Sequence, residues 1–177
     1  RHDTATCGNR TMGDVLKDAM TWLGQQPDTL FIGQGVGPCG GTKMSASFED
    51  VPESKRIEFP VAEDFQMGVS IGLSLEGFVP VSVYPRWNFL LLAANQLVNH
   101  LDALPLFSDY RPRVIIRTAV GSRSPLDPGP QHDGDFTEAV AKMLRTVKVM
   151  RLKPQTDPVA AYQWAYEQSG GTLTVEP

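Results

Sequence analysis

The residues best suited to chemistry lie in four short segments, each of which follows a run with the apolar pattern of a β-strand. These segments are residues 33–41, 60–64, 84–89 and 121–134. In an open parallel sheet, ligands bind outside the carboxyl ends of the strands, so residues that directly follow strands are the first candidates for a site. The sequence therefore directs attention to the glutamate, aromatic, histidine and glycine residues in these segments.

Glu63 lies where a strand passes into a helix, beside Asp64. A lone carboxylate in the first turn of a helix is most often a solvated cap that favours the positive end of the helix dipole. The apolar neighbours Val61, Phe65 and Met67 favour a second interpretation, because a carboxyl group held among apolar side chains can give or share a proton near neutral pH. Glu63 is therefore a candidate for proton exchange with a heterocyclic ring.

Aromatic side chains cluster at the exit of a strand, in residues 84–89 (YPRWNF). They are equally compatible with a hydrophobic core and with an apolar platform on which a flat ring lies. His132 lies near the end of the long loop at residues 121–134, among Gly, Pro and Asp residues. It is either an ordinary surface side chain or a group with acid-base capacity near pH 7.

Gly35, Gly37 and Gly40 form a literal G-x-G-x-x-G after a strand, and the acidic residue Glu58 follows about 20 residues on, as in a dinucleotide-binding loop. Such a loop requires a helix that begins inside the motif, because the amino end of that helix binds the pyrophosphate. The residues that follow are polar and lack helical spacing of apolar side chains, which favours a plain flexible loop. No strand-to-helix nucleophile elbow of the G-x-S-x-G kind follows an expected strand, and the motif G-x-x-x-x-G-K-[ST] does not occur in the sequence.

The periodicity of apolar residues predicts strands and helices in alternation. Strands are expected at residues 29–32, 56–59, 79–84, 113–117, 147–152 and 172–175, and helices at residues 11–25, 60–77, 85–104, 136–145 and from residue 157 onward. This alternation is typical of an α/β fold, here with a parallel sheet of about six strands and helices on both faces. Gly68 and Gly72 lie one turn apart in a helix, and we expect another backbone to pass close to them.

The chain has 177 residues and a formal net charge of -4, and 41% of its residues are hydrophobic. This composition is that of one folded globular domain, and its charge disfavours nucleic acid or an anionic membrane as a partner. No stretch approaches the ~18 apolar residues of a membrane-spanning helix. Two cysteines, Cys7 and Cys39, provide neither a disulfide framework nor a metal-binding spacing, and we expect a cytoplasmic protein.

Several segments, taken in their order and spacing, resemble the pyrimidine-binding domain of thiamine-diphosphate enzymes. The likeness is greatest to the amino-terminal domain of the β subunit in the first component of 2-oxo acid dehydrogenases, within the transketolase-like superfamily. It implies a pyrimidine-binding domain at residues 11–177 and an amino-terminal extension at residues 1–10. The segments that carry it are residues 11–18, 30–34, 56–63, 68–80, 87–89, 130–132 and 172–177.

By this resemblance, Glu63 corresponds to the glutamate that hydrogen-bonds the aminopyrimidine ring of the cofactor and thereby promotes ylid formation. Phe89 would stack on the pyrimidine, with Pro85 at a neighbouring contact position. His132 corresponds to a histidine near the reacting carbon that guides or protonates intermediates. Gln34 stands at a cofactor-binding position where such β subunits usually have a glutamate, so a second carboxylate is missing from the expected site.

A thiamine-diphosphate enzyme also requires a diphosphate-binding domain, whose motif Gly-Asp-Gly followed by Asn anchors Mg²⁺ to the phosphates of the cofactor. The sequence contains no Gly-Asp-Gly, and it ends before the carboxy-terminal domain of a usual β subunit. The resemblance therefore implies an α-type partner subunit that supplies this domain in a hetero-tetramer, and a 2-oxo acid or a ketose as the substrate. Gly68, Gly72 and the apolar helix at residues 85–104 are the expected contacts with other subunits.

Two other functions stay open at this stage. The first is a dinucleotide-binding domain that uses Gly35, Gly37 and Gly40. The second is a non-catalytic relative that serves assembly or regulation after losing the usual second carboxylate. The sequence alone identifies neither the substrate nor the acceptor, which is a lipoyl arm, an aldehyde or a proton.

Overall fold

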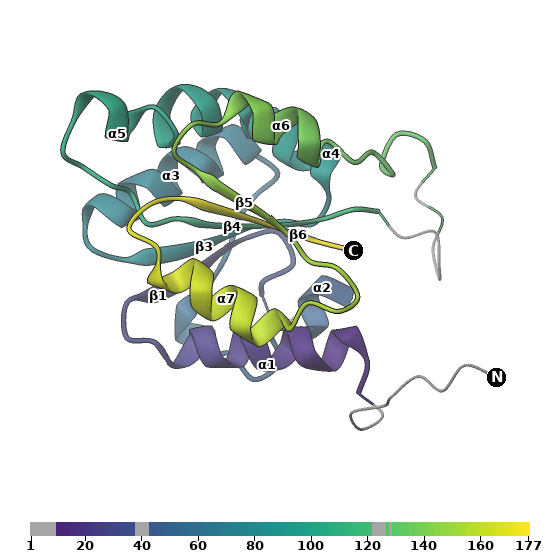
Figure 1. Cartoon of the computed structure of the whole chain (residues 1–177). Helices are drawn as coiled ribbons and strands as arrows, with labels where there is room; N and C mark the ends of the chain where they lie inside the picture. The colour runs from purple at the N-terminus through teal and green to yellow at the C-terminus, as the bar shows by residue number, and fades with distance from the viewer. Residues whose placement is uncertain (1–9, 38–42, 122–126, 128) are drawn as a thin grey trace.

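Six parallel strands form a sheet through the middle of the molecule (Figure 1). The computed structural model describes residues 10–37, 43–121, 127 and 129–177. The order across the sheet is β2-β1-β3-β4-β6-β5, and every pairing is parallel. The strands are β1 (Thr29–Gly33), β2 (Arg56–Glu58), β3 (Val79–Tyr84), β4 (Ile115–Ala119), β5 (Lys148–Arg151) and β6 (Thr172–Glu176).

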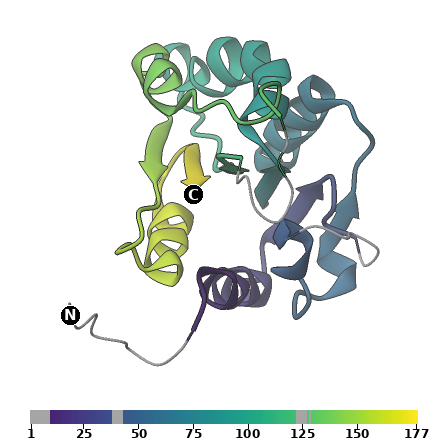
Figure 2. The ribbon, with the colours of Figure 1, turned by 90° about the vertical axis from the view of Figure 1, so that its right-hand side faces the viewer.

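Helices cover both faces of the sheet (Figures 1 and 2). Helices α1 (Met12–Gln25) and α7 (Pro158–Glu167) lie side by side on one face. The other face carries α3 (Glu63–Leu75), α4 (Trp87–Leu90), α5 (Leu104–Phe107) and α6 (Thr137–Met143). The α/β fold that the sequence predicts, with a six-stranded parallel sheet between two helical layers, is therefore confirmed.

The first helix begins where its sequence predicts. Thr11 and Asp14 form a capping box, in which the Thr11 hydroxyl accepts from the Asp14 amide at 3.3 Å and the Asp14 carboxylate accepts from the Thr11 amide at 2.8 Å. This reciprocal pair satisfies two donors that the start of a helix otherwise leaves without a partner. At the start of α7, the Asp157 carboxylate accepts from the Val159 amide at 2.9 Å.

The core consists of two apolar layers, one on each face of the sheet. All six residues of β3 are buried, as expected for a strand covered on both sides. On the face of α1 and α7 the sheet packs against residues such as Leu23, Phe31 and Phe48. On the opposite face it packs against residues such as Met67 and Trp87. The sheet is thus held rigidly from both sides, and its strand ends are fixed in space.

The prediction of a single helix at residues 85–104 is wrong. The chain instead passes through α4, a 3₁₀ turn η2 (Leu91–Ala93), a π turn η3 (Gln96–Leu101) and then α5. The wide π turn ends at Asp102, which is fully buried. Its carboxylate accepts from the backbone amides of Arg145, Thr146 and Val147, at 2.7 to 3.0 Å. This distant anchor, just before β5, accounts for the local departure from a regular helix.

Two further expectations differ from the structure. The stretch before β2 contains a short helix, α2 (Lys43–Ala46), and a 3₁₀ turn, η1 (Glu53–Lys55), neither of which the sequence predicts. No backbone of the described chain passes close to Gly68 or Gly72. A Cβ atom at Gly68 would meet only the side chain of Gln96, at 3.9 Å, and one at Gly72 would meet nothing within 4 Å. This face of α3 is therefore open in the described part of the chain.

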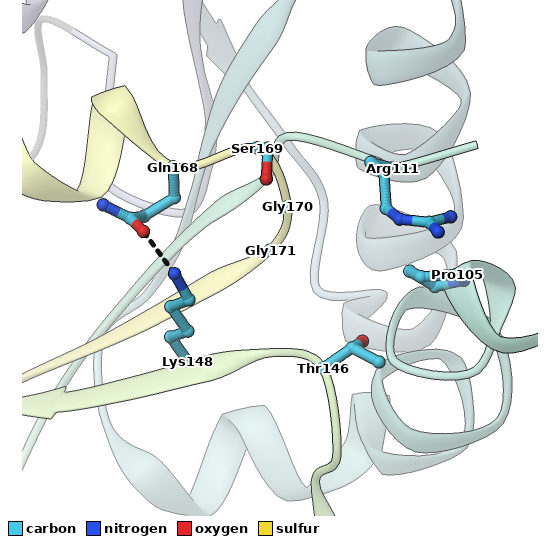
Figure 3. A pocket seen from close by; sticks show the side chains of 8 residues that line it. All are labelled: Pro105, Arg111, Thr146, Lys148, Gln168, Ser169, Gly170 and Gly171. Atoms are coloured by element: carbon cyan, nitrogen blue, oxygen red, sulfur yellow. Dashed lines mark hydrogen bonds between the residues drawn. The ribbon is translucent and has the colours of Figure 1, made fainter. Parts of the chain in front are cut away.

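The two edges of the sheet, where the strands begin and where they end, have different features. The strands end toward the right of Figure 1, at what we call the carboxyl edge, and Figure 2 views that edge. A pocket of about 270 Å³ lies at the opposite, amino edge (Figure 3). Its lining includes Arg111, Lys148 and the turn at residues 168–171. Within the described residues, no helix is long and apolar enough to cross a membrane.

Candidate active site

The residues that the sequence singles out come together at the carboxyl edge of three neighbouring strands. Gln34 directly follows β1, Phe89 lies in α4 after β3, and His132 lies in the loop after β4. These strands are adjacent in the order β1-β3-β4. Glu63 begins α3, which packs on β1 and β3. The side chains therefore share one edge of the sheet, where an open parallel sheet binds its ligands.

Glu63 is buried, with only 4% of its surface exposed. Its Oε1 accepts a hydrogen bond from the Gln34 side-chain amide at 3.2 Å, and no ion pair involves it among the described residues. The expected apolar enclosure is partly wrong, because Val61 and Phe65 are 77% and 64% exposed, whereas Met67 is buried. Of the three expected apolar neighbours, only Met67 is therefore buried like Glu63.

A polar network fixes the first turn of α3 and thereby positions Glu63. The Gln66 amide nitrogen donates toward the carbonyls of Val83 and Ile32, at 3.0 and 3.3 Å, and lies 3.1 Å from the Ser82 hydroxyl. The Tyr84 hydroxyl donates to the backbone carbonyl of Glu63 at 3.3 Å. Burial raises the pKa of that phenol well above its usual range, so it stays a donor at neutral pH.

The backbone of β1 approaches β3 closely just before Gln34. Gly33 has a φ of 149°, and a Cβ atom there would clash with the carbonyl oxygen of Val83. Only glycine is therefore compatible with this approach. It places Gln34 at the end of the strand, within reach of Glu63.

Phe89 and His132 form a second pair at this edge. Their ring centroids lie 5.3 Å apart with the planes tilted by 44°, and both residues are half-buried. The Nδ1 atom of His132 and the Oδ1 atom of Asn88 are buried and have no hydrogen-bond partner among the described residues. Buried polar atoms without partners are uncommon in folded proteins and mark places where a ligand or water is required.

The aromatic side chains at residues 84–89 differ in burial, so some belong to the core and one lies at the rim. Tyr84 and Trp87 are fully buried, and the Trp87 indole donates to the Thr137 hydroxyl at 3.1 Å, so both belong to the core. Phe89 is only half-buried and lies at the rim. It is the aromatic side chain of this segment that is placed to serve as a platform. Pro85, which is also half-buried, lies at the turn between β3 and α4.

Sequence reasoning missed Arg86 as a site residue. Its Nη1 donates to the His132 carbonyl at 3.3 Å, and a Cβ atom at Gly121 would lie 2.8 Å from the same nitrogen. Arg86 therefore connects the end of β3 to the loop after β4. A signal was available, because Arg86 is a cation directly after a strand and beside the aromatic residues that drew attention.

The glycine loop has a different role from the one that a dinucleotide site would need. The Glu58 carboxylate accepts from the amides of Gly35 and Gly37, at 2.8 and 2.6 Å. These amides would otherwise be free for phosphate oxygens. Gly40 lies outside the described residues, and so do both cysteines. The described part of the loop is thus closed by an acidic side chain of β2, which argues against pyrophosphate binding there.

The chain has relatives among the β subunits of pyruvate dehydrogenase. It is 30% identical over 109 residues to the pyruvate dehydrogenase E1 component subunit beta of Chaetosphaeridium globosum, covering 59% of this chain and 33% of the relative. It is 26% identical over 141 residues to the same subunit of Staurastrum punctulatum, covering 78% of this chain and 42% of the relative. The chain resembles these β subunits in sequence. The resemblance that the motifs predict is therefore confirmed.

Solved structures of similar fold agree with the sequence relatives. A split-gene transketolase, described as an inactive β4 tetramer, superposes with a TM-score of 0.70 at 19% identity, covering 92% of this chain and 49% of that one. A transketolase from Leishmania mexicana gives a TM-score of 0.64, also at 19% identity, covering 93% of this chain and 24% of that one. At this identity the likeness establishes the transketolase-like fold alone.

The match to E1 β subunits is partial in length. The chain spans 33% and 42% of the two curated relatives described above. No model of a protein family matches the chain.

Proposed function

We propose that the chain is a subunit of a thiamine-diphosphate-dependent enzyme whose active site is completed by a partner chain. The observation that best supports this proposal is Glu63, a buried carboxylate at the ligand-binding edge of the sheet, held by one amide and by no cation of the described residues. The likeness to pyruvate dehydrogenase E1 β subunits adds to it. The substrate class that follows is a 2-oxo acid, with a ketose as the alternative that the transketolase fold suggests.

The described residues fit an aminopyrimidine ring. Glu63 has a carboxylate oxygen that accepts no hydrogen bond from the described residues. Phe89 offers a half-buried aromatic ring, and His132 has a buried nitrogen that no described residue hydrogen-bonds. These are the groups that a flat, polar heterocycle needs: a hydrogen-bonding carboxyl group at its edge and an aromatic ring for its face.

Each residue has a separate task in this proposal. Thiamine diphosphate, when bound, supplies the electron sink for cleavage beside a carbonyl group. Glu63 holds a proton at the ring nitrogen of the aminopyrimidine, and the amide of Gln34 orients the carboxylate. Phe89 stacks on the aminopyrimidine ring, with Pro85 at a neighbouring contact position. His132 accepts or returns a proton near the reacting carbon.

The partner supplies the rest of the site in this proposal. It is an α-type subunit with the diphosphate-binding domain and the Mg²⁺ ion, and the two chains form a hetero-tetramer. The face of α3 at Gly68 and Gly72 is the proposed contact, because among the described residues nothing lies within 4 Å of a Cβ atom at Gly72 and only the Gln96 side chain lies near one at Gly68. Exposed Phe65 and Leu92 add apolar surface on α3 and the neighbouring turn η2.

The first experiment captures this chain, tagged, from the cells that make it, and analyses bound protein and released cofactor by mass spectrometry. We expect a partner that carries Gly-Asp-Gly, together with thiamine diphosphate. The purified complex should then exchange the thiazolium C2 proton for deuterium in the presence of Mg²⁺. Recovery of neither partner nor cofactor, even with both cofactors added, would contradict the proposal.

The contact surface has its own test. Gly72→Leu places a bulky side chain on the open face of α3 and should prevent assembly, while the chain itself stays folded because nothing lies within 4 Å of that position. Gly170→Leu, which also meets nothing within 4 Å but lies at the amino edge, is the matched control. Sedimentation of the mixture with the partner would distinguish them. Normal assembly of Gly72→Leu would place the interface elsewhere.

The two rival functions have distinct outcomes in the same experiments. A non-catalytic relative would bind the partner but would support no C2 exchange at any cofactor concentration. A dinucleotide-binding protein would take up nicotinamide or flavin nucleotides, measurable by near-ultraviolet absorbance. The Glu58 carboxylate on the loop amides disfavours this last reading.

A further inference from the structure

Arg86 differs from the other buried or half-buried arginines of the described chain in the groups that surround its charge. Four described arginines are buried or half-buried, and three of them face a carboxylate. Arg117 pairs with Glu176 at 2.7 Å, Arg113 with Asp28 at 3.5 Å and Arg56 with Glu53 at 3.9 Å. Arg86, the fourth, has no carboxylate within 4 Å among the described residues.

The absence of a described carboxylate beside Arg86 matters because a half-buried charge has lost part of its hydration. Such a group is normally compensated by an opposite charge or by several hydrogen bonds. Among the described residues, Arg86 makes one hydrogen bond, from Nη1 to the His132 carbonyl at 3.3 Å, although a guanidinium carries five N–H donors. The remaining donors form a fork whose geometry matches a carboxylate or a phosphate.

Arg86 is also held in position rather than free to turn into solvent. A side chain at Gly121 would come within 2.8 Å of its Nη1, so glycine leaves the space that the guanidinium occupies. His132, which accepts its hydrogen bond, lies against Phe89. The guanidinium is therefore fixed beside the proposed platform and the proposed acid-base group.

We propose that Arg86 binds an anionic group of the substrate and sets the preference of the site for negatively charged substrates. This inference rests on the proposed function and names the substrate property that the site selects. The anionic group is the carboxylate of a 2-oxo acid or the phosphate of a sugar. Because the arginine holds the group in the bound substrate as well as in the transition state, its loss should raise KM and leave kcat nearly unchanged.

The first test uses the chain alone and needs no turnover. Pyruvate and inorganic phosphate are titrated, in the millimolar range typical of weak ligands, while the arginine Nε–H signals are followed by nuclear magnetic resonance. We expect a saturable shift of the Arg86 signal and none for Arg111, an exposed arginine at the amino edge. Equal, non-saturating shifts of both signals would overturn the inference, whatever becomes of the proposed enzyme activity.

The second test uses the assembled complex and identifies the anionic group. Arg86→Gln should raise KM for the preferred donor by about 10- to 100-fold, as expected for a lost hydrogen bond between charged groups. Arg86→Lys should restore part of the affinity, and Arg111→Gln should change nothing. Pyruvate and fructose 6-phosphate, compared as donors, decide between carboxylate and phosphate.

The outcomes separate the inference from the function on which it rests. If C2 exchange proceeds normally in Arg86→Gln but KM is unchanged for both donors, Arg86 has no role in specificity and the proposed function stands. If kcat falls while KM stays constant, Arg86 acts only through the position of His132. If the wild-type complex shows no C2 exchange, the proposed function fails, and saturable binding by the chain alone still decides the role of Arg86.

Discussion

Two glutamates are buried to the same extent near the carboxyl edge of the sheet, yet their surroundings are opposite. Glu63 and Glu176 are each 4% exposed. Glu176 receives both arms of the Arg117 guanidinium, at 2.7 and 3.0 Å, and the Tyr162 hydroxyl at 2.7 Å. Glu63 receives one amide, from Gln34 at 3.2 Å. Burial alone therefore does not separate a structural carboxylate from a functional one.

The number and charge of the partners separate them instead. Arg117 also donates to the Ser47 hydroxyl at 2.7 Å and lies over the Phe48 ring, so its donors are used within the fold. Burial, with a further contribution from Glu176, raises the pKa of the Tyr162 phenol well above its usual range, so the phenol remains a donor. The charges of this cluster are paired within the fold, whereas Glu63 faces no cation among the described residues.

The largest expected effect is on activity. Glu63→Gln should reduce C2 proton exchange in the assembled complex by about 10² to 10⁴-fold, the range for loss of a positioned acid-base group. The stability of the chain should change little, because Glu63 has no charged partner to lose. Thermal unfolding of the chain and C2 exchange of the complex measure the two quantities.

The matched comparison is Glu58→Gln, another glutamate at the carboxyl edge, whose partners are two loop amides. It should leave C2 exchange within about threefold of wild type, since a glutamine oxygen still accepts from one of the two amides and Glu58 has no part in the proposed chemistry. Normal exchange in Glu63→Gln would remove Glu63 from the mechanism and with it the contrast with Glu176.

The next effect is on stability. Glu176→Gln should lower the free energy of unfolding by about 3 to 5 kcal/mol, because it leaves the fully buried Arg117 without its counter-charge. Chemical denaturation of the chain measures the loss. The double variant Arg117→Met/Glu176→Leu removes both charges and should recover much of it. If Glu176→Gln were as stable as wild type, the ion pair with Arg117 would contribute nothing to stability. Its charged partner would then not distinguish Glu176 from Glu63.

The sheet could be predicted from the sequence because it depends on local patterns. Buried parallel strands are short apolar runs, and a capping box such as Thr11 and Asp14 lies within four residues. The break in the expected helix at residues 85–104 could not be predicted from the sequence. The Asp102 carboxylate that follows it accepts hydrogen bonds from amides more than 40 residues away, and such distant partners leave no local pattern.

The candidate site shows the same division. Its segments follow strands and could be located, but the setting of Glu63 was misjudged. Val61 and Phe65 are near Glu63 in sequence, yet residues one or two apart around a helix start do not face each other. The lack of a carboxylate beside Arg86 among the described residues could not be predicted either, because ion pairing in a fold is decided by non-local neighbours.

A smaller effect is expected at Gln34. Gln34→Met keeps the size of the side chain but removes the amide that donates to Glu63. C2 exchange should fall by about tenfold, the value of one hydrogen bond to a charged group, with thermal stability nearly unchanged. Trp22→Phe, at α1 on the opposite face, is a control for general damage. A drop as large as that of Glu63→Gln would mean that Gln34 itself takes part in proton transfer.

The smallest effect concerns the exposed carboxylate of Asp14, whose largest interactions are hydrogen bonds with Thr11, with smaller contributions from the charges of Arg10 and Lys17. The backbone amide of Thr11, and then its hydroxyl, hold the pKa of Asp14 below its usual range. A lowered pKa in the folded state means that the capping box contributes its stability above the unfolded pKa, and that this contribution is lost as the pH falls through the folded value. The start of α1 should therefore loosen only under acidic conditions.

Carboxyl carbon chemical shifts followed through an acid titration should show Asp14 titrating below the ~3.9 of an unfolded aspartate. Thr11→Ala removes the hydroxyl but keeps the backbone amide, so it should raise the Asp14 pKa only part of the way back. A wild-type Asp14 that titrates at the unfolded value would show that hydrogen bonds at an exposed position leave a carboxylate unchanged. The contrast between Glu63 and Glu176 would then rest on the charge of Arg117 rather than on the number of donors, since burial is equal at the two sites.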